Sequence, residues 1–296
     1  YMEAGMAPSV FIDGEAGTTG LQIRQRLEGR QDIELVSIDP ARRKDRHARA
    51  DMLNAADAVI LCLPDEAAKE AVALIRNPRT KVIDASSAHR VAPGWVYGFA
   101  ELERGAQRAR IAAATRISNP GCYPTGFIAL VAPIVAAGLI PRDFPLTVNA
   151  VSGYLGGGKG LIAEFEGETP ARDAFRSYGL NLAHKHLPEM QAYCGLAHPP
   201  VFAPAVAPFA QGMIVEVPLQ LWALPERPTA DALRMRLEEA YRGERFVRVA
   251  DAGEIEALRK ARAGAAGSVE ALNPARLAGS NGLELYVFAN EAQDQA

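Results

Sequence analysis

The chain has 296 residues, with 32 Lys and Arg residues against 35 Asp and Glu residues, which gives a formal net charge of −3. This length predicts two domains of moderate size. A hydrophobic fraction of 49% and a charged fraction of 23% are typical of a globular protein and exclude a disordered one. The near balance of charge argues against nucleic acid as a partner. No apolar run approaches the roughly 20 residues of a membrane span, so no membrane partner is expected.

Three cysteines, Cys62, Cys122 and Cys194, are spread along the chain. An odd number of distant cysteines is a poor disulfide framework, and the absence of a CxxC motif or a Cys/His cluster argues against zinc. We see no signal peptide, because no charged segment precedes a long apolar one. We therefore expect a reduced, cytoplasmic enzyme without a metal, with its natural start near Met6.

The first part of the chain alternates strand-like and helix-like segments. We expect strands at 10–13, 33–38, 57–63 and 81–84, and helices at 17–27 and 65–75, the latter with Asp65 near its N-terminal cap. The third strand is apolar almost throughout and is therefore expected to be buried on both faces. This alternation indicates a parallel sheet of βαβ units. We predict a Rossmann-like dinucleotide-binding domain over residues 1–119.

The pattern changes from about residue 120. We expect a helix at 124–137 and strands at 146–151, 213–221 and 283–289. Apolar and polar residues alternate along 213–221, which predicts an antiparallel sheet with one solvated face. The predicted fold class is α/β, in which an α+β catalytic and oligomerisation domain over residues 120–296 follows the dinucleotide-binding domain.

A glycine-rich turn, Gly-Glu-Ala-Gly-Thr-Thr-Gly, follows the first predicted strand. Gly14, Gly17 and Gly20 would allow a tight turn and a close approach of the backbone to a pyrophosphate. Thr18 and Thr19 open the following helix, whose N–H groups would face the phosphates. The spacing is GxxGxxG rather than GxGxxG, so a purely structural turn is the alternative.

Charged residues follow the second predicted strand. Asp39 lies about 20 positions after the turn, where an acidic residue holds the ribose of NAD, whereas a nearby arginine accommodates the extra phosphate of NADP. Because Arg42 and Arg43 follow Asp39 closely, we predict NADP(H) as the cofactor. A solvated charged loop is the alternative interpretation.

The densest motif is Asn-Pro-Gly-Cys-Tyr-Pro-Thr-Gly at 119–126. It places Cys122 at the start of a predicted helix, with Pro124 at an early helical position. The unpaired N–H groups and the positive dipole end of a helix lower the pKa of a thiol and favour the thiolate. We expect Cys122 to be reactive, and Cys62 and Cys194 to pack as small apolar side chains.

This motif resembles the active-site motif of the N-acetyl-gamma-glutamyl-phosphate reductases, NADPH-dependent enzymes of arginine biosynthesis. The turn at 14–20, Ser-Gly at 152–153 and His-Lys-His-Leu-Pro-Glu at 184–189 match in the same order, and the run 37–44 resembles the shorter of the family's two types. The resemblance covers nearly the whole chain. Aspartate-semialdehyde dehydrogenases share the architecture but differ around the cysteine.

The resemblance implies a covalent mechanism. The Cys122 thiolate would attack the acyl phosphate and expel phosphate, and a hydride from NADPH would reduce the resulting thioester to the semialdehyde. Such a nucleophile needs a base within hydrogen-bond reach, and the matching residues are His184 and His186. Two residues apart on an extended segment, they can face the same way, and Pro188 would start a short helix after them. We expect His184 to be the leading acid/base and His186 the second.

Further site residues are expected from the same resemblance. The segment 84–90 ends a strand at the carboxyl edge of the sheet, where ligands bind; it contains Ser86, a candidate for the cofactor, and Arg90, a candidate for the phosphate or carboxylate of the substrate. Ser152 and Glu189 are candidates for positioning the substrate. Glycines at 156–158 could form an anion-binding concavity or simply a flexible loop.

The predicted function is therefore NADPH-dependent reduction of a small-molecule acyl phosphate, N-acetyl-gamma-glutamyl phosphate. The alternatives are an aspartate-semialdehyde dehydrogenase, a reductase of a carrier-bound aminoadipyl phosphate, or a non-catalytic NADP-sensing protein. The resemblance also implies a homo-oligomer, either a dimer or a tetramer. In the family, a strand and a helix that completes the nucleotide domain follow the strand at 283–289, whereas this chain ends at Ala296.

Overall fold

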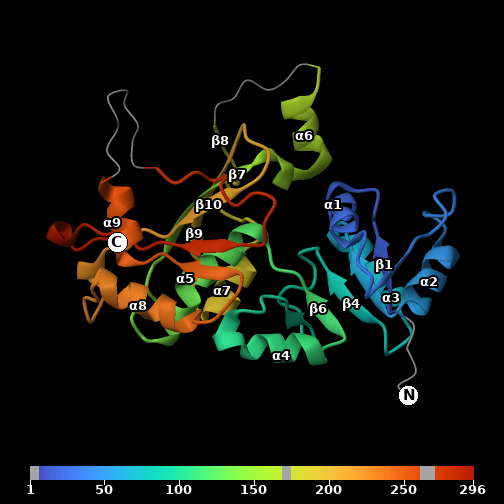
Figure 1. The fold of residues 1–296 in the computed structure, drawn as a ribbon, viewed down its shortest axis with the longest axis horizontal. Helices are drawn as coiled ribbons and strands as arrows, with labels where there is room; N and C mark the ends of the chain where they lie inside the picture. The colour runs from blue at the N-terminus through green and yellow to red at the C-terminus, as the bar shows by residue number, and fades with distance from the viewer. Residues whose placement is uncertain (1–6, 169–174, 261–270) are drawn as a thin grey trace. The chain divides into compact units, whose positions relative to one another are not determined.

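The computed structural model describes residues 7–168, 175–260 and 271–296, so that the expected start at Met6 lies outside the described residues. The chain divides into two compact units (Figure 1). Unit 1 consists of Tyr1–Phe99 and Ala109–Gly121, and unit 2 consists of Ala100–Arg108 and Cys122–Ala296. Each unit is described by itself.

Unit 1 contains a six-stranded sheet in which every neighbouring pair of strands is parallel. The strand order is β2-β1-β3-β4-β6-β5. The strands are β1 (Ser9–Asp13), β2 (Glu34–Val36), β3 (Ala58–Leu61), β4 (Lys81–Asp84), β5 (Val96–Tyr97) and β6 (Arg116–Ser118), and the helices are α1 (Thr18–Leu27), α2 (Arg46–Ala55) and α3 (Asp65–Leu74), with α4 (Ala106–Ala113) crossing the boundary between the units. The predicted parallel βαβ sheet is confirmed.

The core of unit 1 lies between the sheet and two of its helices. Phe11, Val59 and Leu61 from the strands pack with Leu53 of α2 and Ala68 of α3, and all five are buried. Along β3 the buried positions alternate with half-buried ones. The prediction that this strand is buried on both faces was therefore too strong.

Two helix starts of unit 1 bear on the sequence-based expectation. Asp65 lies next to the cap of α3 as expected, since it is the first residue of the helix and Pro64 occupies the cap position. Its carboxylate accepts hydrogen bonds from the backbone N–H and the hydroxyl of Ser87. Helix α2 was not predicted from its sequence, although Asp45 caps it by accepting from the N–H groups of His47 and Ala48.

The main sheet of unit 2 is mixed rather than antiparallel. Its order is β10-β7-β9-β8, with β7 (Thr147–Gly153) parallel to β9 (Val201–Ala207) and the edge strands β10 (Met213–Glu216) and β8 (Arg176–Ser177) antiparallel to their neighbours. The antiparallel prediction was wrong for the central pair, because alternation reveals burial and not strand direction. The predicted strand at 213–221 already ends at Glu216, shortly before Pro218, which has no N–H to donate to a ladder.

A second, two-stranded sheet pairs β11 (Val247–Val249) with β12 (Leu283–Leu285) in parallel, so the strand expected at 283–289 is shorter than predicted. The helices of unit 2 are α5 (Cys122–Ala136), α6 (Gly158–Glu166), α7 (Leu187–Cys194), α8 (Ala230–Ala240) and α9 (Ala252–Lys260), and the 3₁₀ turns are η1 (Leu102–Gly105), η2 (Tyr154–Gly157), η3 (Leu221–Ala223) and η4 (Glu291–Gln293). None of the helices in the described part of the chain is long and apolar enough to cross a membrane.

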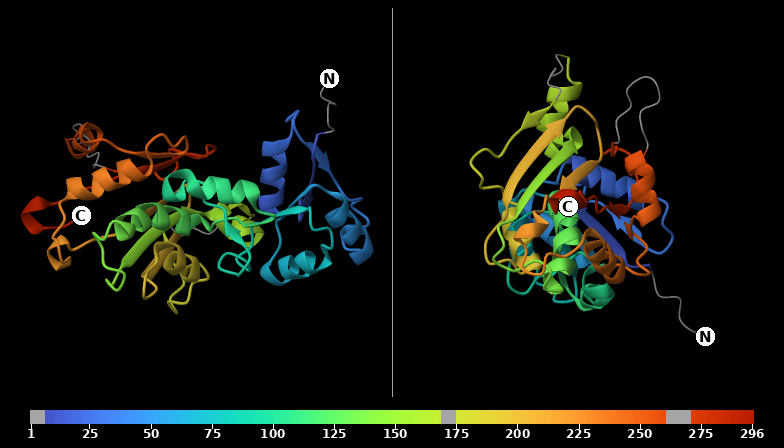
Figure 2. Two further views of the ribbon diagram at one scale, coloured as in Figure 1. Left: turned by 90° about the horizontal axis from the view of Figure 1, so that it is seen from below. Right: turned by 90° about the vertical axis from the view of Figure 1, so that its left-hand side faces the viewer.

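Helix α5 is the central helix of unit 2 (Figures 1 and 2). It packs on β10 so closely that a Cβ on Gly126 would lie 2.9 Å from a methyl group of Val215. The hydroxyl of Tyr241, which directly follows α8, donates to the carbonyl of Ala129 at 2.9 Å. The helix's own residues are apolar on most of its sides, and many of them are buried, as expected for a helix in a core.

Candidate active site

Cys122 is the first residue of α5, as the motif predicted, and its side chain is exposed. The segment before it is held by two hydrogen bonds within unit 1. The N–H of Asn119 donates to the carbonyl of Asp84 at 2.7 Å, and Nε of Arg90 donates to the carbonyl of Asn119 at 3.1 Å. Cys122 therefore begins a helix at the end of an anchored segment. The N-terminal end of a helix stabilises negative charge, here that of a thiolate.

Tyr123 links the start of α5 to the sheet of unit 2. Its ring is buried, and its hydroxyl is hydrogen-bonded with Ser152 Oγ at 2.9 Å, with the Ala205 carbonyl at 3.0 Å and with the Tyr178 hydroxyl at 3.2 Å. Burial raises the pKa of both phenols, and the charge of a Cys122 thiolate raises them further. The two tyrosines thus form, with Ser152, a polar cluster beside the cysteine.

The predicted histidines lie together at this cluster. The ring centroids of His184 and His186 are 4.6 Å apart, and they lie 6.3 and 6.0 Å from that of Tyr123. Nδ1 of His184 accepts a hydrogen bond from the backbone N–H of His186 at 3.1 Å. A ring nitrogen that accepts carries no proton, so neutral His184 has its proton on Nε2.

Helix α7 begins immediately after the histidine pair. His186 is at its cap position and Pro188 is in its first turn, so the helix start was predicted correctly. Glu189 lies three residues beyond His186 and is only 1% exposed. Burial, followed by the charge of Glu189, raises the pKa of Tyr193 to about 12. Glu189 is thus a buried acidic residue in the first turn of the helix that follows the histidine pair.

Arg90, a predicted substrate ligand, is buried in unit 1 and has backbone acceptors. In addition to the Asn119 carbonyl, its guanidinium donates to the carbonyl of Ala85 at 3.3 Å. It thereby ties the loop after β4 to the segment that precedes Cys122. These bonds give the arginine a positioning role in unit 1.

The same loop contains a buried polar cluster around Asp84. One carboxylate oxygen of Asp84 lies 2.6 Å from the Ser86 hydroxyl and 2.6 Å from Nδ1 of His89. The ring of His89 stacks on Trp95 with centroids 4.1 Å apart. Ser86, a predicted cofactor ligand, therefore lies on a loop that these contacts hold at the carboxyl end of β4.

The glycine turn of unit 1 has the geometry of a dinucleotide-binding turn. Gly14 has φ +92°, and a Cβ there would lie 2.4 Å from the carbonyl oxygen of Cys62; a Cβ on Gly20 would lie 2.3 Å from the carbonyl oxygen of Gly14. Gly17 occupies the cap position of α1, so no side chain at the cap blocks the first N–H groups of that helix. These residues fit a cofactor whose pyrophosphate lies against a helix N-terminus.

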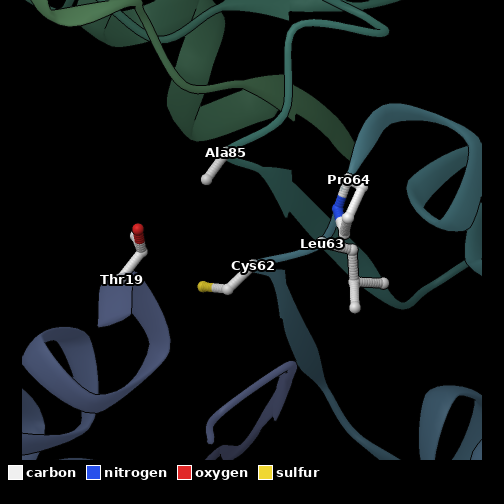
Figure 3. Close-up of a pocket in the computed structure, with 5 residues that line it drawn as sticks. All are labelled: Thr19, Cys62, Leu63, Pro64 and Ala85. Atoms are coloured by element: carbon white, nitrogen blue, oxygen red, sulfur yellow. The ribbon is translucent and has the colours of Figure 1, made fainter. Parts of the chain in front are cut away.

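A pocket of about 240 Å³ opens beside this helix start (Figure 3). It is lined by Thr19 from α1, by Cys62, Leu63 and Pro64 after β3, and by Ala85 after β4. Burial, together with the negative charges of Asp13 and Asp84, raises the pKa of Cys62 to about 11. Its thiol therefore stays protonated at neutral pH and forms a neutral wall of the pocket.

The charged loop after β2 is exposed, including Asp39, Arg42 and Arg43. One carboxylate oxygen of Asp39 accepts from the N–H of Ala41 at 2.9 Å, and the Arg42 guanidinium lies 3.5 Å from the Asp45 carboxylate.

The glycines at 156–158 belong to η2 and the first residue of α6. Within the described residues, no group of three or more His, Cys, Asp or Glu side chains could hold a metal ion.

Sequence reasoning missed Tyr178 and did not use Tyr123. Tyr123 could have been found, because it is adjacent to Cys122 in the motif. Tyr178 lies 55 residues away from it in sequence, and no periodic or spacing signal connects the two. Only the pairing of β8 with β9 brings Tyr178 to the site.

Comparisons with known proteins agree with this geometry. Residues 122–296 match the model of the semialdehyde dehydrogenase dimerisation domain, and residues 40–110 match that of the semialdehyde dehydrogenase NAD binding domain. An N-acetyl-gamma-glutamyl-phosphate reductase of Trichormus variabilis is 49% identical over 98% of this chain and 89% of its own length, and one of Chelativorans sp. is 50% identical over 98% and 91%.

Solved structures agree on the fold. An aspartate semialdehyde dehydrogenase from Francisella tularensis superposes with a TM-score of 0.62 at 13% identity, covering 94% of this chain and 89% of that one. This likeness confirms the predicted combination of a Rossmann-like domain with an α+β domain. With both family models and relatives near 50% identity, the chain belongs to the semialdehyde dehydrogenase family and, within it, to the N-acetyl-gamma-glutamyl-phosphate reductases.

Proposed function

We propose that this chain reduces N-acetyl-gamma-glutamyl phosphate to N-acetylglutamate 5-semialdehyde with NADPH, using Cys122 as the nucleophile. The observation that carries the proposal is the exposed Cys122 at the start of α5, next to a tyrosine whose ring contacts both histidines of the His-Lys-His motif. The identity of about 50% with reductases of this name supports the substrate.

In the first step, Sγ of Cys122 forms a bond to the acyl carbon, and the bond from that carbon to the phosphate oxygen breaks. Phosphate leaves with the electron pair of that bond, and the product is a thioester. The N-terminal N–H groups of α5 favour the thiolate that starts this step. NADPH, when bound, supplies the hydride that reduces the thioester carbon. Collapse of the resulting hemithioacetal releases the aldehyde and regenerates Cys122.

The two histidines have different parts in this proposal. Because Nδ1 of His184 accepts from the backbone, its Nε2 carries the proton in the neutral ring. His184 is thereby suited to donate a proton or hydrogen bond to the substrate oxygen as negative charge develops on it. His186 is buried beside Glu189 on the same helix start, and we assign it to holding the His184 ring and assisting proton transfer.

The remaining candidate ligands are assigned by their chemistry. Arg90 is the candidate for an anionic group of the substrate, since a guanidinium can hold a carboxylate or phosphate with two donors. Ser152 is kept in place by Tyr123 and is the candidate for orienting the reacting group. Gly14, Gly17, Gly20, Thr18 and Thr19 are the candidates for holding the pyrophosphate of the cofactor, with Ser86, Asp39, Arg42 and Arg43 as further contacts.

The oligomer is proposed to be a dimer formed through the dimerisation domain. The face of the main sheet opposite α5 is solvated in the single chain, with Thr147, Asn149 and Val201 exposed along paired strands. A dimer that covers this face would bury the apolar part of it. The finer alternative of a tetramer would require a second contact surface.

The reaction is tested in reverse, with N-acetylglutamate semialdehyde, phosphate and NADP⁺. We expect NADPH formation that requires phosphate and that falls by at least about a thousandfold in Cys122→Ser, because the serine hydroxyl lacks the thiolate's nucleophilicity. Cys194→Ser, a substitution of a thiol outside the site, is the matched control. Undiminished activity of Cys122→Ser would overturn the mechanism.

The competing functions give different results in the same assay. Preference for aspartate semialdehyde over the N-acetylated substrate would identify the other acyl-phosphate reductase. Binding of NADPH without turnover of either aldehyde, together with alkylation of Cys122 no faster than that of a free thiol, would identify a non-catalytic sensor. We expect neither, because relatives near 50% identity are N-acetyl-gamma-glutamyl-phosphate reductases, and because the cysteine and both histidines of a catalytic site are present.

A further inference from the structure

Three side chains meet beside the glycine turn of unit 1 in a cluster that no step above uses. Nη1 of Arg24, on α1, lies 2.8 Å from a carboxylate oxygen of Glu15 and 2.7 Å from the hydroxyl of Ser37. The Ser37 hydroxyl donates to the same Glu15 oxygen at 3.1 Å. The Arg24 and Glu15 side chains are about one-third and one-quarter exposed, so a ligand can reach them.

The position of this cluster suggests its ligand. Glu15 is the second residue of the glycine turn, and Ser37 directly follows the carboxyl end of β2. In dinucleotide-binding domains, the residues at this strand end face the adenosine ribose and distinguish its 2′-hydroxyl from a 2′-phosphate. The cluster therefore stands between the part of the turn that faces the pyrophosphate and the strand end that faces the ribose.

The loop residues that the sequence predicted to select NADP, Asp39, Arg42 and Arg43, are less well placed for this than Arg24. Arg42 is exposed and pairs with Asp45, which in turn caps α2. Asp39 uses a carboxylate oxygen in its own turn. By contrast, Arg24 projects from a helix and is fixed by Glu15 and Ser37, so less side-chain freedom is lost when it binds an anion.

We propose that Arg24 binds the 2′-phosphate of NADP(H), with Glu15 and Ser37 holding the Arg24 guanidinium in position. The proposal rests on the cofactor of the proposed function and assigns its specificity to residues of α1 and the β2 end. Arg24 uses Nη1 for both Glu15 and Ser37, and a guanidinium has five N–H donors, so it can grip a phosphate without releasing Glu15. Its pairing with Glu28 at 3.3 Å is an i,i+4 contact at the surface and competes weakly.

Binding measurements test this without relying on turnover. Isothermal titration of the unliganded protein with NADPH and NADH is compared between wild type and Arg24→Gln. We expect Arg24→Gln to weaken the binding of NADPH by about tenfold or more, the usual value of a hydrogen bond to a charged group. The affinity for NADH should change by less than about twofold. Ser37→Ala should act in the same direction with a smaller loss.

Smaller probes separate the phosphate from the rest of the cofactor. Adenosine 2′,5′-bisphosphate should lose affinity in Arg24→Gln as NADPH does, whereas adenosine 5′-monophosphate should not. Arg30→Gln is the matched control, because Arg30 is an exposed arginine of the same unit that pairs with Asp32. This variant should bind NADPH, NADH and both adenosine phosphates as the wild type does.

Three results would overturn the proposal. If Arg24→Gln weakened the binding of NADPH and of NADH equally, the role of Arg24 would be merely structural. An unchanged affinity for NADPH in this variant would exclude any role of Arg24 in recognition. If Glu15→Gln weakened the binding of NADH but left that of NADPH unchanged, Glu15 would be shown to bind a ribose 2′-hydroxyl instead. Failure of the wild type to bind either dinucleotide would count against the proposed function itself and is distinguishable from all three.

Discussion

At the scale of single residues, the three thiols have different electrostatic surroundings. Cys194 is 4% exposed and burial alone raises its pKa. Cys62 is half-buried, and burial with two nearby carboxylates raises its pKa to about 11. Cys122 is exposed at the start of a helix, whose N–H groups stabilise a thiolate. Only one of the three thiols is therefore in a position to react at neutral pH.

This difference predicts the pattern of alkylation by iodoacetamide. At pH 8, about one Cys62 side chain in a thousand is a thiolate, because the pH lies about three units below the pKa of this thiol. Cys122 should react first, and Cys62 should react slowly, at a rate that rises about tenfold for each pH unit up to pH 10. Peptide mass mapping of a time course measures both. A Cys62 rate equal to that of Cys122 at pH 8 would contradict the prediction.

Tyr123 supports a second prediction at this scale. Its buried hydroxyl is hydrogen-bonded with Ser152 and with the Ala205 carbonyl. Tyr123→Phe should lower the free energy of unfolding by about 1–3 kcal/mol, since it leaves buried polar partners unsatisfied. Thermal or urea unfolding measures the loss. The matched control is Tyr154→Phe, which removes an exposed hydroxyl bonded to Glu166 and should leave stability unchanged.

The site residues were accessible to sequence reasoning to different degrees. Cys122 and the histidine pair stand in compact motifs whose local spacing already implies a helix start and a shared face. Tyr178 and Arg24 were not found, because their partners lie on other elements and only the folded chain brings them together. Arg90 was singled out as a ligand, but its bonds to two backbone carbonyls could not be predicted from the sequence.

At the scale of elements, the glycine turn shows how backbone geometry restricts the sequence. Gly14 combines a positive φ with a neighbouring carbonyl 2.4 Å from where a Cβ would lie. Gly29, after α1, has a φ of +81° but nothing within 4 Å. Both positions have a left-handed φ, which strains any residue with a Cβ, but only at Gly14 would the Cβ also clash.

Alanine at each position therefore separates the two effects. Gly29→Ala should cost about 1 kcal/mol of unfolding free energy, from strain alone. Gly14→Ala should cost about 2–4 kcal/mol, because the clash forces the turn away from the end of β3. It should also weaken dinucleotide binding, which Gly29→Ala should preserve. Chemical denaturation and NADPH titration check both variants, and equal losses in stability would contradict this explanation.

The success of the prediction also varied between elements. Four of the six strands of unit 1 were predicted, because their apolar runs alternate with helices, and each of the four overlaps an observed strand. The short strands β5 and β6 were not predicted. Strand β9 was missed, because Pro204 interrupts its apolar pattern, and its parallel pairing with β7 cannot be inferred from either strand alone. Strand direction depends on the route of the connection, which side-chain alternation does not encode.

At the scale of the whole molecule, the candidate residues are divided between the two units. Unit 1 contributes the dinucleotide turn and Arg90, and unit 2 contributes Cys122, Ser152 and the histidines. The boundary between Gly121 and Cys122 falls inside the active-site motif. The proposed nucleophile is thus the first residue of the second segment of unit 2, and it directly follows the segment of unit 1 that Asp84 and Arg90 anchor.

The proposed dimer predicts the effect of a charge on the open face of the main sheet. Val201 on β9 is 53% exposed and lies on this face beside Thr147. Val201→Glu should convert a dimer to a monomer, because a carboxylate buried between two copies has no partner. The matched control is Met235→Glu on α8, where the native side chain is 55% exposed. Light scattering after size-exclusion chromatography measures the mass, and a Val201→Glu variant that keeps the mass of the wild-type dimer would place the contact on another surface.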